Sequence, residues 1–192
     1  MKLPQLLKEV RSCTACAAHL PQGVRPVLQV SSNARILIVG QAPGRKVHES
    51  GVPFDDASGE RLRAWMGVTR EQFYDASITA ILPMGFCYPG TGKSGDLPPR
   101  KECAPLWREQ LLAAMPNIQL TLVIGQYAMD WHMKESQAST LTETVKGWRD
   151  HHSSVLPLPH PSPRNNIWLK ANPWFVADVV PALQKRVARL LG

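Results

Sequence analysis

Short segments rich in β-branched residues alternate with helical patterns along this chain of 192 residues, and this alternation restricts the possible folds more than any other feature. ARILIVG (34–40) and LTLVIG (120–125) have the composition of buried strands, and each stops at a glycine. SITAIL (77–82) and SSVLPL (153–158) are weaker strand candidates. Strands that alternate with helices predict an α/β fold with a parallel sheet covered on both faces.

The helical patterns are recognised by the spacing of their apolar residues. The N-terminal residues MKLPQLLKEVRSC indicate an amphipathic helix rather than a signal peptide. Pro181 should bend or break the last helix, because proline has no backbone N–H to donate. The other expected helices cover 59–67, 100–115, 125–133 and 173–191.

The composition is that of a soluble globular protein with an excess of positive charge. The chain has 22 Lys and Arg against 15 Asp and Glu, which gives a net charge of +7. This charge favours a polyanionic partner, and DNA or another nucleic acid is the first candidate. No apolar run is long enough to span a membrane. We therefore expect one domain over residues 1–192, a monomer, located in the cytoplasm and without a membrane partner.

The four cysteines form a C-x2-C pair, Cys13 and Cys16, and a C-x15-C pair, Cys87 and Cys103. In a reducing compartment such thiols are unlikely to form structural disulfides, but they can bind zinc or an iron–sulfur cluster. Only the first pair has the tight spacing that structural zinc sites use, so zinc is the weaker of these two interpretations. Four unrelated buried thiols remain the alternative to a metal site.

Two polar loops follow predicted strands. GQAPG (40–44) comes after the first strand, and HPSPRN (160–165) comes after the last one. Ligands of parallel α/β sheets bind at the carboxyl ends of the strands, where such loops lie. Prolines surround His160, which by itself is also compatible with a surface turn.

These two loops, GVPF at 51–54 and the cysteine spacing together resemble the uracil-DNA glycosylase superfamily, and most of all its family 4, the iron–sulfur branch. The resemblance covers residues from about 10 to 170. It implies a three-layer α/β/α fold with a four-stranded parallel sheet. It also implies a [4Fe–4S] cluster on the four cysteines and excision of uracil or another deaminated base from DNA, by N-glycosidic bond hydrolysis in base-excision repair.

The resemblance also implies roles for single residues. His160 would donate a hydrogen bond to the departing base and so stabilise its negative charge, as an oxyanion hole does. Phe54 would stack on the flipped base, unless it is an ordinary core phenylalanine. The backbone of the first loop, including Gly40 and Ala42, would approach the base and sugar.

DNA contacts are implied for the second loop and for basic residues. Ser162 would bind a phosphate, and Arg164, with Asn165 beside it, would enter the space left by the flipped base or contact the minor groove. Arg45 and Lys46 are candidate phosphate contacts, although each is also compatible with a solvated surface charge. Lys93, Arg100 and Lys101 are further candidates of the same kind.

Two positions depart from the family 4 pattern. Gln41 stands where that family has a catalytic glutamate, and an amide can orient water but cannot accept its proton. Glu49 and Asp55 are close in sequence and could replace the carboxylate. Ala80 stands where a base-reading asparagine is expected, so discrimination among bases should be relaxed. The glycine-rich segment 83–100 is long, and Asp96 is the only carboxylate in it.

Two other functions stay open from the sequence. A non-catalytic iron–sulfur protein that kept the fold and binds nucleic acid is favoured by Gln41 and Ala80, whereas His160 and Phe54 favour the enzyme. A zinc-containing α/β hydrolase is the weaker alternative, because the sequence lacks the G-x-S-x-G motif of such enzymes.

Overall fold

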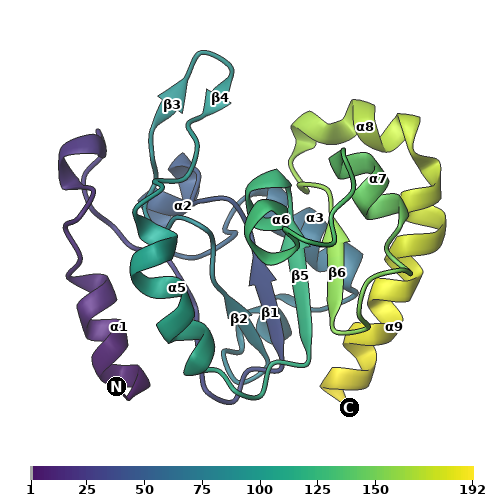
Figure 1. Cartoon of the computed structure of the whole chain (residues 1–192), viewed down its shortest axis with the longest axis horizontal. Helices are drawn as coiled ribbons and strands as arrows, with labels where there is room; N and C mark the ends of the chain where they lie inside the picture. The colour runs from purple at the N-terminus through teal and green to yellow at the C-terminus, as the bar shows by residue number, and fades with distance from the viewer. Residues whose placement is uncertain (1) are drawn as a thin grey trace.

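The computed structural model describes residues 2–192, and its centre is a sheet of four parallel strands (Figure 1). In the order in which they pair, the strands are β2 (Thr79–Ile81), β1 (Ile36–Val39), β5 (Leu120–Ile124) and β6 (Val155–Leu158). The α/β class, the parallel sheet and its four predicted strands are therefore confirmed, with slightly shorter strands than expected.

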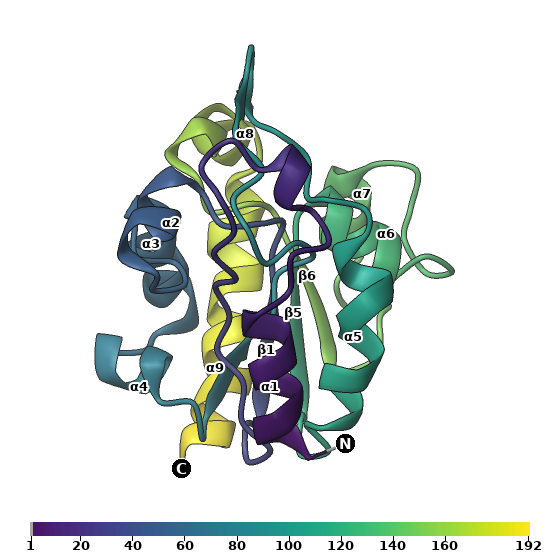
Figure 2. The same ribbon diagram turned by 90° about the vertical axis from the view of Figure 1, so that its left-hand side faces the viewer.

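Helices cover both faces of this sheet, as Figure 2 shows in a view along its edge. One face carries α2 (Arg45–Ser50), α3 (Ala57–Met66), α4 (Arg70–Tyr74) and α9 (Val180–Leu191). The opposite face carries α5 (Cys103–Ala113), α6 (Gln126–His132) and α7 (Leu141–Lys146). Three further groups of helical segments complete the described part of the chain: α1 (Leu3–Arg11), which lies beside α5; α8 (Asn166–Ala171); and the short turns Ala17–His19, Pro163–Asn165 and Phe175–Val179.

Both faces of the strands are buried. Ile38, Leu122 and Leu156 are fully inaccessible to solvent, as are most of their neighbours in the sheet. A strand covered on both sides needs apolar residues at successive positions, not only at alternate ones. This requirement explains why the strands appeared in the sequence as nearly continuous apolar runs.

The last helix shows the expected effect of its proline. Residues Phe175–Val179 form a π-helical turn, and α9 begins at Val180, so that Pro181 lies in its first turn. Proline is tolerated there because the first N–H groups of a helix have no partner within it. The four helices that the sequence did not predict, α2, α4, α7 and α8, have only five or six residues each, too few for a periodic pattern.

A small antiparallel hairpin rises from the glycine-rich segment above the carboxyl edge of the sheet (Figure 1). Its strands are β3 (Thr91–Gly92) and β4 (Gly95–Asp96), and the Leu97 N–H donates to the Gly90 carbonyl at 2.8 Å. The sequence predicted only a long loop here. Across residues 2–192, no helix has the length and apolar character needed to cross a membrane.

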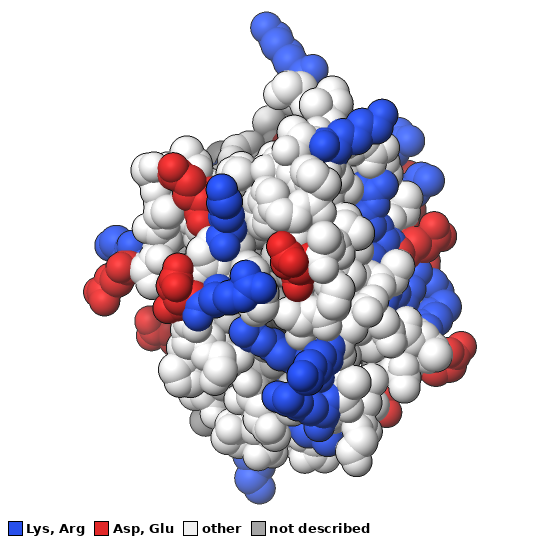
Figure 3. All heavy atoms as spheres, turned by 90° about the vertical axis from the view of Figure 1, so that its right-hand side faces the viewer, with Lys and Arg blue, Asp and Glu red and all other residues white. Residues whose placement is uncertain are grey.

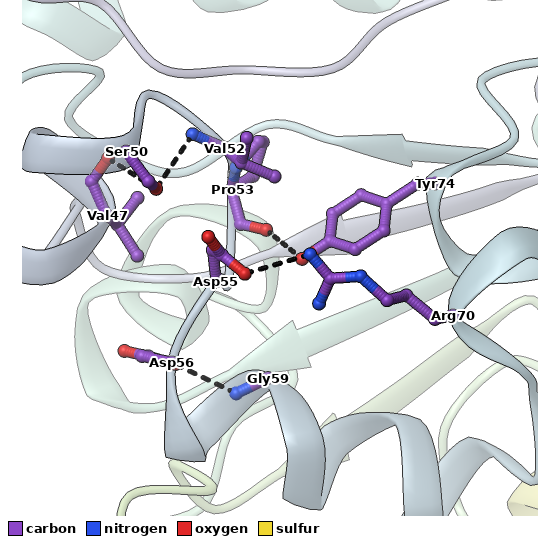
Figure 4. Close-up of polar contacts among 9 residues, drawn as sticks. All are labelled: Val47, Ser50, Val52, Pro53, Asp55, Asp56, Gly59, Arg70 and Tyr74. Atoms are coloured by element: carbon purple, nitrogen blue, oxygen red, sulfur yellow. Dashed lines mark hydrogen bonds and ion pairs between the residues drawn. The ribbon is translucent and has the colours of Figure 1, made fainter.

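The turn that leads into α3 is fixed by side chains from three directions (Figure 4). The Tyr74 hydroxyl donates to the Pro53 carbonyl at 2.9 Å, and Arg70 forms an ion pair with Asp55 at 3.0 Å. Asp56 caps α3 by accepting the Gly59 N–H at 2.9 Å. Between these contacts lies Phe54, whose φ of 54° is rare for any residue except glycine.

Phe54 can hold this conformation because Gly59 gives it room. A Cβ atom on Gly59 would collide with the Phe54 carbonyl oxygen, which is backbone and cannot move independently. The absence of a side chain at Gly59 therefore lets the Phe54 turn pack directly against α3. This packing comes at a cost, because glycine weakens a helix interior by roughly 1 kcal/mol relative to alanine.

We expect Gly59→Ala to destabilise the protein by about 1–3 kcal/mol, because the cost of overpacking exceeds the gain in helix propensity. Urea denaturation measures this change in the free energy of unfolding. The control is Gly147→Ala, where φ is −81° and the nearest atom would lie 3.3 Å from the new Cβ. Equal stability of the Gly59→Ala protein and the wild type would contradict the role given to this glycine.

Candidate active site and cysteine cavity

A cavity of about 430 Å³ opens at the carboxyl edge of the sheet. Its walls come from the ends of β1, β2 and β6, from the turn before α3 and from the β3–β4 hairpin. Segments that are distant in the sequence thus meet at the edge where parallel sheets bind ligands. Of the residues singled out from the sequence, those that line this cavity are Gly40, Gln41, Ala42, Phe54, Asp96, His160, Ser162, Arg164 and Asn165.

His160 is held in one orientation and one tautomer. The Ser162 backbone N–H lies 3.2 Å from Nδ1 and can only donate, so Nδ1 accepts and the neutral ring carries its proton on Nε2. The Asn165 side chain donates to the His160 carbonyl at 2.8 Å. Arg61, which the sequence reasoning missed, reaches from α3 and donates to the Ser162 carbonyl at 3.0 Å.

The surroundings of His160 favour the neutral ring. Burial lowers its pKa, while the negative charges of Asp56 and Asp96 act in the opposite direction and are the smaller effects. At neutral pH His160 is therefore an uncharged N–H donor that lines the cavity. Such a donor can stabilise an anion that forms in front of it.

Phe54 provides an apolar wall. Its ring lies against Gly40, where an added Cβ would come within 3.4 Å of it, and it meets Phe73 edge-on with ring centroids 6.2 Å apart. Ile81 and Pro83 also line the cavity, whereas Ala80 is fully buried and pairs with Leu37 in the sheet. The apolar walls can accept a flat ring, but Ala80 does not reach the cavity.

The two carboxylates that the sequence suggested as replacements for a glutamate at position 41 do not belong to the cavity. Glu49 pairs with Arg45 at 3.6 Å and Asp55 pairs with Arg70, and neither lines the cavity. Asp56, which sequence reasoning missed, does line it, as does Asp96 of the hairpin. The helix-capping position before ASGERL was the signal that could have identified Asp56.

Gln41 contacts the hairpin directly. Its side-chain nitrogen donates to the Leu97 carbonyl at 3.3 Å. Arg164 approaches the hairpin from the opposite loop, since a Cβ on Gly95 would collide with its guanidinium. The two loops and the hairpin therefore converge around the mouth of the cavity.

Basic residues lie near this mouth but also elsewhere. Arg45 and Lys46 begin α2 directly after the GQAPG loop, and both are exposed. Arg100 instead pairs with Glu102 at 2.7 Å and lines a different cavity. Figure 3 shows that Lys and Arg side chains also gather on another face of the molecule, so the positive charge is not confined to the edge of the sheet.

That second cavity is lined by all four cysteines, which are partly buried and form no disulfide. Cys13 and Cys16 follow α1, Cys87 belongs to the segment after β2, and Cys103 begins α5. Within residues 2–192, no three His, Cys, Asp or Glu side chains are grouped closely enough to hold a metal ion. The structure thus brings the predicted ligands to one cavity without forming a compact site for a single ion.

The donors around the cysteine cavity need acceptors. Arg100 and Trp107 both line this cavity. The Arg100 Nε and the Trp107 Nε1 are buried and have no hydrogen-bond partner. Buried N–H groups without partners are costly, and sulfur atoms of a cluster are acceptors that can satisfy them. The donor set therefore fits a sulfur-rich, negatively charged group.

A buried charge supports the same conclusion. Arg108 is fully buried, donates to the Leu82 carbonyl at 2.9 Å and 3.3 Å, and leaves its Nε without a partner. Burial lowers its pKa to about 10 and raises that of the nearby Cys103 thiol to about 12. None of the ion pairs found in the described part of the chain includes Arg108. A negatively charged group beside Cys103 would balance this cation.

Comparison with known proteins gives consistent matches. The sequence model of the uracil DNA glycosylase superfamily matches residues 28–184. The Type-4 uracil-DNA glycosylase of Archaeoglobus fulgidus is 30% identical over 129 residues, which is 66% of this chain and 61% of that protein. That of Thermotoga maritima is 30% identical over 86 residues, 43% of this chain and 45% of that protein.

A third relative, the Type-4 uracil-DNA glycosylase of Saccharolobus solfataricus, is 26% identical over 137 residues, 69% of this chain and 60% of that protein. The chain spans less than two thirds of the length of each of these relatives. The superfamily match nevertheless covers most of the chain, including the three motifs that line the cavity. The chain therefore belongs to the uracil-DNA glycosylase superfamily, and its similarity within that superfamily is to family 4.

Proposed function

We propose that this protein excises uracil or another deaminated base from DNA by hydrolysing the N-glycosidic bond, as the first step of base-excision repair. The observation that carries this proposal is the fixed tautomer of His160, which presents an Nε2–H donor in a cavity with an apolar wall. The names of the similar proteins support the same activity.

The reaction transfers charge from the sugar to the base. As the bond between the base and the sugar C1′ breaks, its electron pair leaves with the base, and the sugar becomes positive. His160 donates to a base oxygen, a bond that strengthens as negative charge develops there. Phe54 stacks on the base that has left the helix, and Gly40 allows the backbone to come close to it.

A second function has a specific observation in its favour. The Gln41 amide is engaged with the Leu97 carbonyl, and an amide cannot accept a proton from water in any case. A protein that binds DNA without cutting the glycosidic bond would need no carboxylate at this position. The two functions differ in one measurable property, which is base release.

We expect His160→Ala to slow base excision by about 100- to 1000-fold, because it removes a donor that acts mainly in the transition state. The measurement is single-turnover cleavage of oligonucleotides that carry uracil, hypoxanthine or xanthine, followed by alkaline cleavage at abasic sites. DNA affinity should change little, since the hydrogen bond is weak before charge develops.

The control is His152→Ala, which removes an exposed imidazole that contacts Ser154. Full activity of His160→Ala on every substrate of the wild type would reduce this histidine to part of a turn. A wild type that releases no base from any substrate would support the binding protein instead.

For the cysteine cavity, we propose a structural [4Fe–4S] cluster on Cys13, Cys16, Cys87 and Cys103, with zinc as the weaker alternative. Such a cluster bonds through thiolates and supplies a cross-link between the segments that carry them. Support comes from the buried donors without partners on Arg100 and Trp107, and from the uncompensated charge of Arg108.

We expect anaerobically purified protein to be brown and to contain about four irons per chain, and Cys103→Ser to lose most of this iron. Arg108→Met should make the protein lose its cluster faster when it is diluted into a chelator, because the cation that balances the cluster is gone. The same variant should stabilise the metal-free protein, because it removes an unpaired buried charge. Arg186→Met is the control, since Arg186 donates to the Ser153 and Val155 carbonyls and does not line the cysteine cavity. Zinc without iron, or equal chelator sensitivity of all variants, would contradict the proposal.

DNA is the proposed partner, and we propose that the protein acts as a monomer in the cytoplasm. Ser162, Asn165 and Arg164 lie at the mouth of the cavity, where the DNA backbone would pass if a base were inside. Arg45 and Lys46 lie on the adjacent helix start. These residues would neutralise phosphates and release counterions.

We expect DNA affinity to fall steeply with salt, and Lys46→Ala to reduce the slope of log affinity against log salt by about one. Fluorescence anisotropy with a labelled duplex at several salt concentrations measures both quantities. Lys8→Ala is the control for net charge, because Lys8 lies on α1 rather than at the cavity mouth. The same slope for Lys46→Ala and the wild type would mean that Lys46 does not contact a phosphate.

A further inference from the structure

We propose that Asp96, on the β3–β4 hairpin, supplies the carboxylate for hydrolysis that position 41 does not provide. This inference rests on the proposed glycosylase function and assigns a catalytic residue to it. Asp96 comes from the segment between β2 and α5 in which the sequence showed only a long glycine-rich loop.

The position of Asp96 is the first reason. It lines the same cavity as His160 and Phe54, and its Oδ2 would lie only 3.3 Å from a Cβ placed on Gly44. Gly44 ends the GQAPG loop that also contains Gln41. The hairpin therefore brings a carboxylate next to the loop in which a carboxylate is missing.

The hairpin is also fixed in place. The Tyr88 hydroxyl donates to Asp96 Oδ1 at 3.4 Å, a long contact that leaves Oδ2 available. The Gln41 side chain holds the next residue by donating to the Leu97 carbonyl at 3.3 Å. Gln41 thus acts as a positioning residue for the segment that carries Asp96.

Each of the other nearby carboxylates already makes a contact that holds the fold. Asp56 uses Oδ1 to cap α3, and Glu49 and Asp55 form ion pairs with arginines outside the cavity. Asp96 takes part in none of the ion pairs among residues 2–192. Of the two carboxylates that line the cavity, Asp96 is the one that neither caps a helix nor forms an ion pair within the described residues.

The location of Asp96 along the depth of the cavity decides what its charge would do. Asp96 is exposed, whereas Ile81, on another wall, is buried. A base inserted against Ile81 and Phe54 would leave its sugar at the mouth, beside Asp96. A negative charge there stabilises the positive sugar, while the same charge against the base would oppose the departing anion.

In the proposed step, water replaces the base at C1′. The C1′–N bond breaks and its electron pair leaves on the base, whose oxygen accepts a hydrogen bond from His160. The oxygen of a water molecule bonds to C1′, and the proton of that water passes to the Asp96 carboxylate. Asp96 then returns this proton to solvent or to the departed base, so that water and substrate become free base and an abasic sugar.

The test compares Asp96→Asn and Asp96→Glu with the wild type. Asparagine keeps the size and removes the charge, and we expect it to lower the single-turnover rate by about 100-fold or more, whereas glutamate should restore part of the rate. Affinity for a duplex with an uncleavable abasic analogue should be unchanged or tighter in Asp96→Asn, because a negative charge near phosphates is lost.

The control is Glu109→Gln, which removes one exposed carboxylate from α5, away from the cavity. An Asp96→Asn rate equal to that of Glu109→Gln would overturn the role of Asp96 while the glycosylase function stands. A loss of rate that is explained entirely by weaker DNA binding would also overturn it. If the wild type itself releases no base, the proposed function fails, and this inference fails with it.

Discussion

The parallel hydrogen bonding of β1, β5 and β6 is the constraint on which the rest of the site depends. It pairs Val39 with Val123 and Ile124 with Leu158, so that β1 and β6 end at the same edge of the sheet. The GQAPG and HPSPRN loops then face each other, although more than a hundred residues separate them in the sequence. No single contact between the loops is needed to bring them together, because the sheet already does so.

The two cavities share one stretch of chain, which links the proposed cluster to the proposed active site. Pro83 lines the first cavity and Gly85 lines the second, and both follow β2 directly. The Gly85 N–H donates to the Gln41 carbonyl at 2.9 Å, and Arg108 from α5 holds the Leu82 carbonyl. A group bound by the cysteines would therefore stabilise the chain segment that forms one wall of the first cavity.

Much of this arrangement could be predicted from the sequence, for definite physical reasons. Buried parallel strands need continuous apolar runs, and these located all four strands and hence the edge where the motifs meet. The hairpin was missed because strands of two residues leave no alternating pattern. Asp56 was missed because the helix expected over 59–67 begins at Ala57, so its cap was not recognised. Ala80 was aligned by motif alone, and motif alignment does not show that Ile81, not Ala80, faces the cavity.

The change at position 41 and the hairpin are physically connected. The Gln41 nitrogen donates to the Leu97 carbonyl, and an ionised glutamate at this position would have no hydrogen to donate there. It would also add a further negative charge to a cavity that Asp56 and Asp96 already line, where like charges raise the cost of ionisation. An amide at 41 is thus compatible with a carboxylate at 96, whereas a glutamate at 41 would add repulsion and lose the hydrogen bond to the hairpin. The amide at position 41 is therefore matched to the hairpin that it holds above the GQAPG loop.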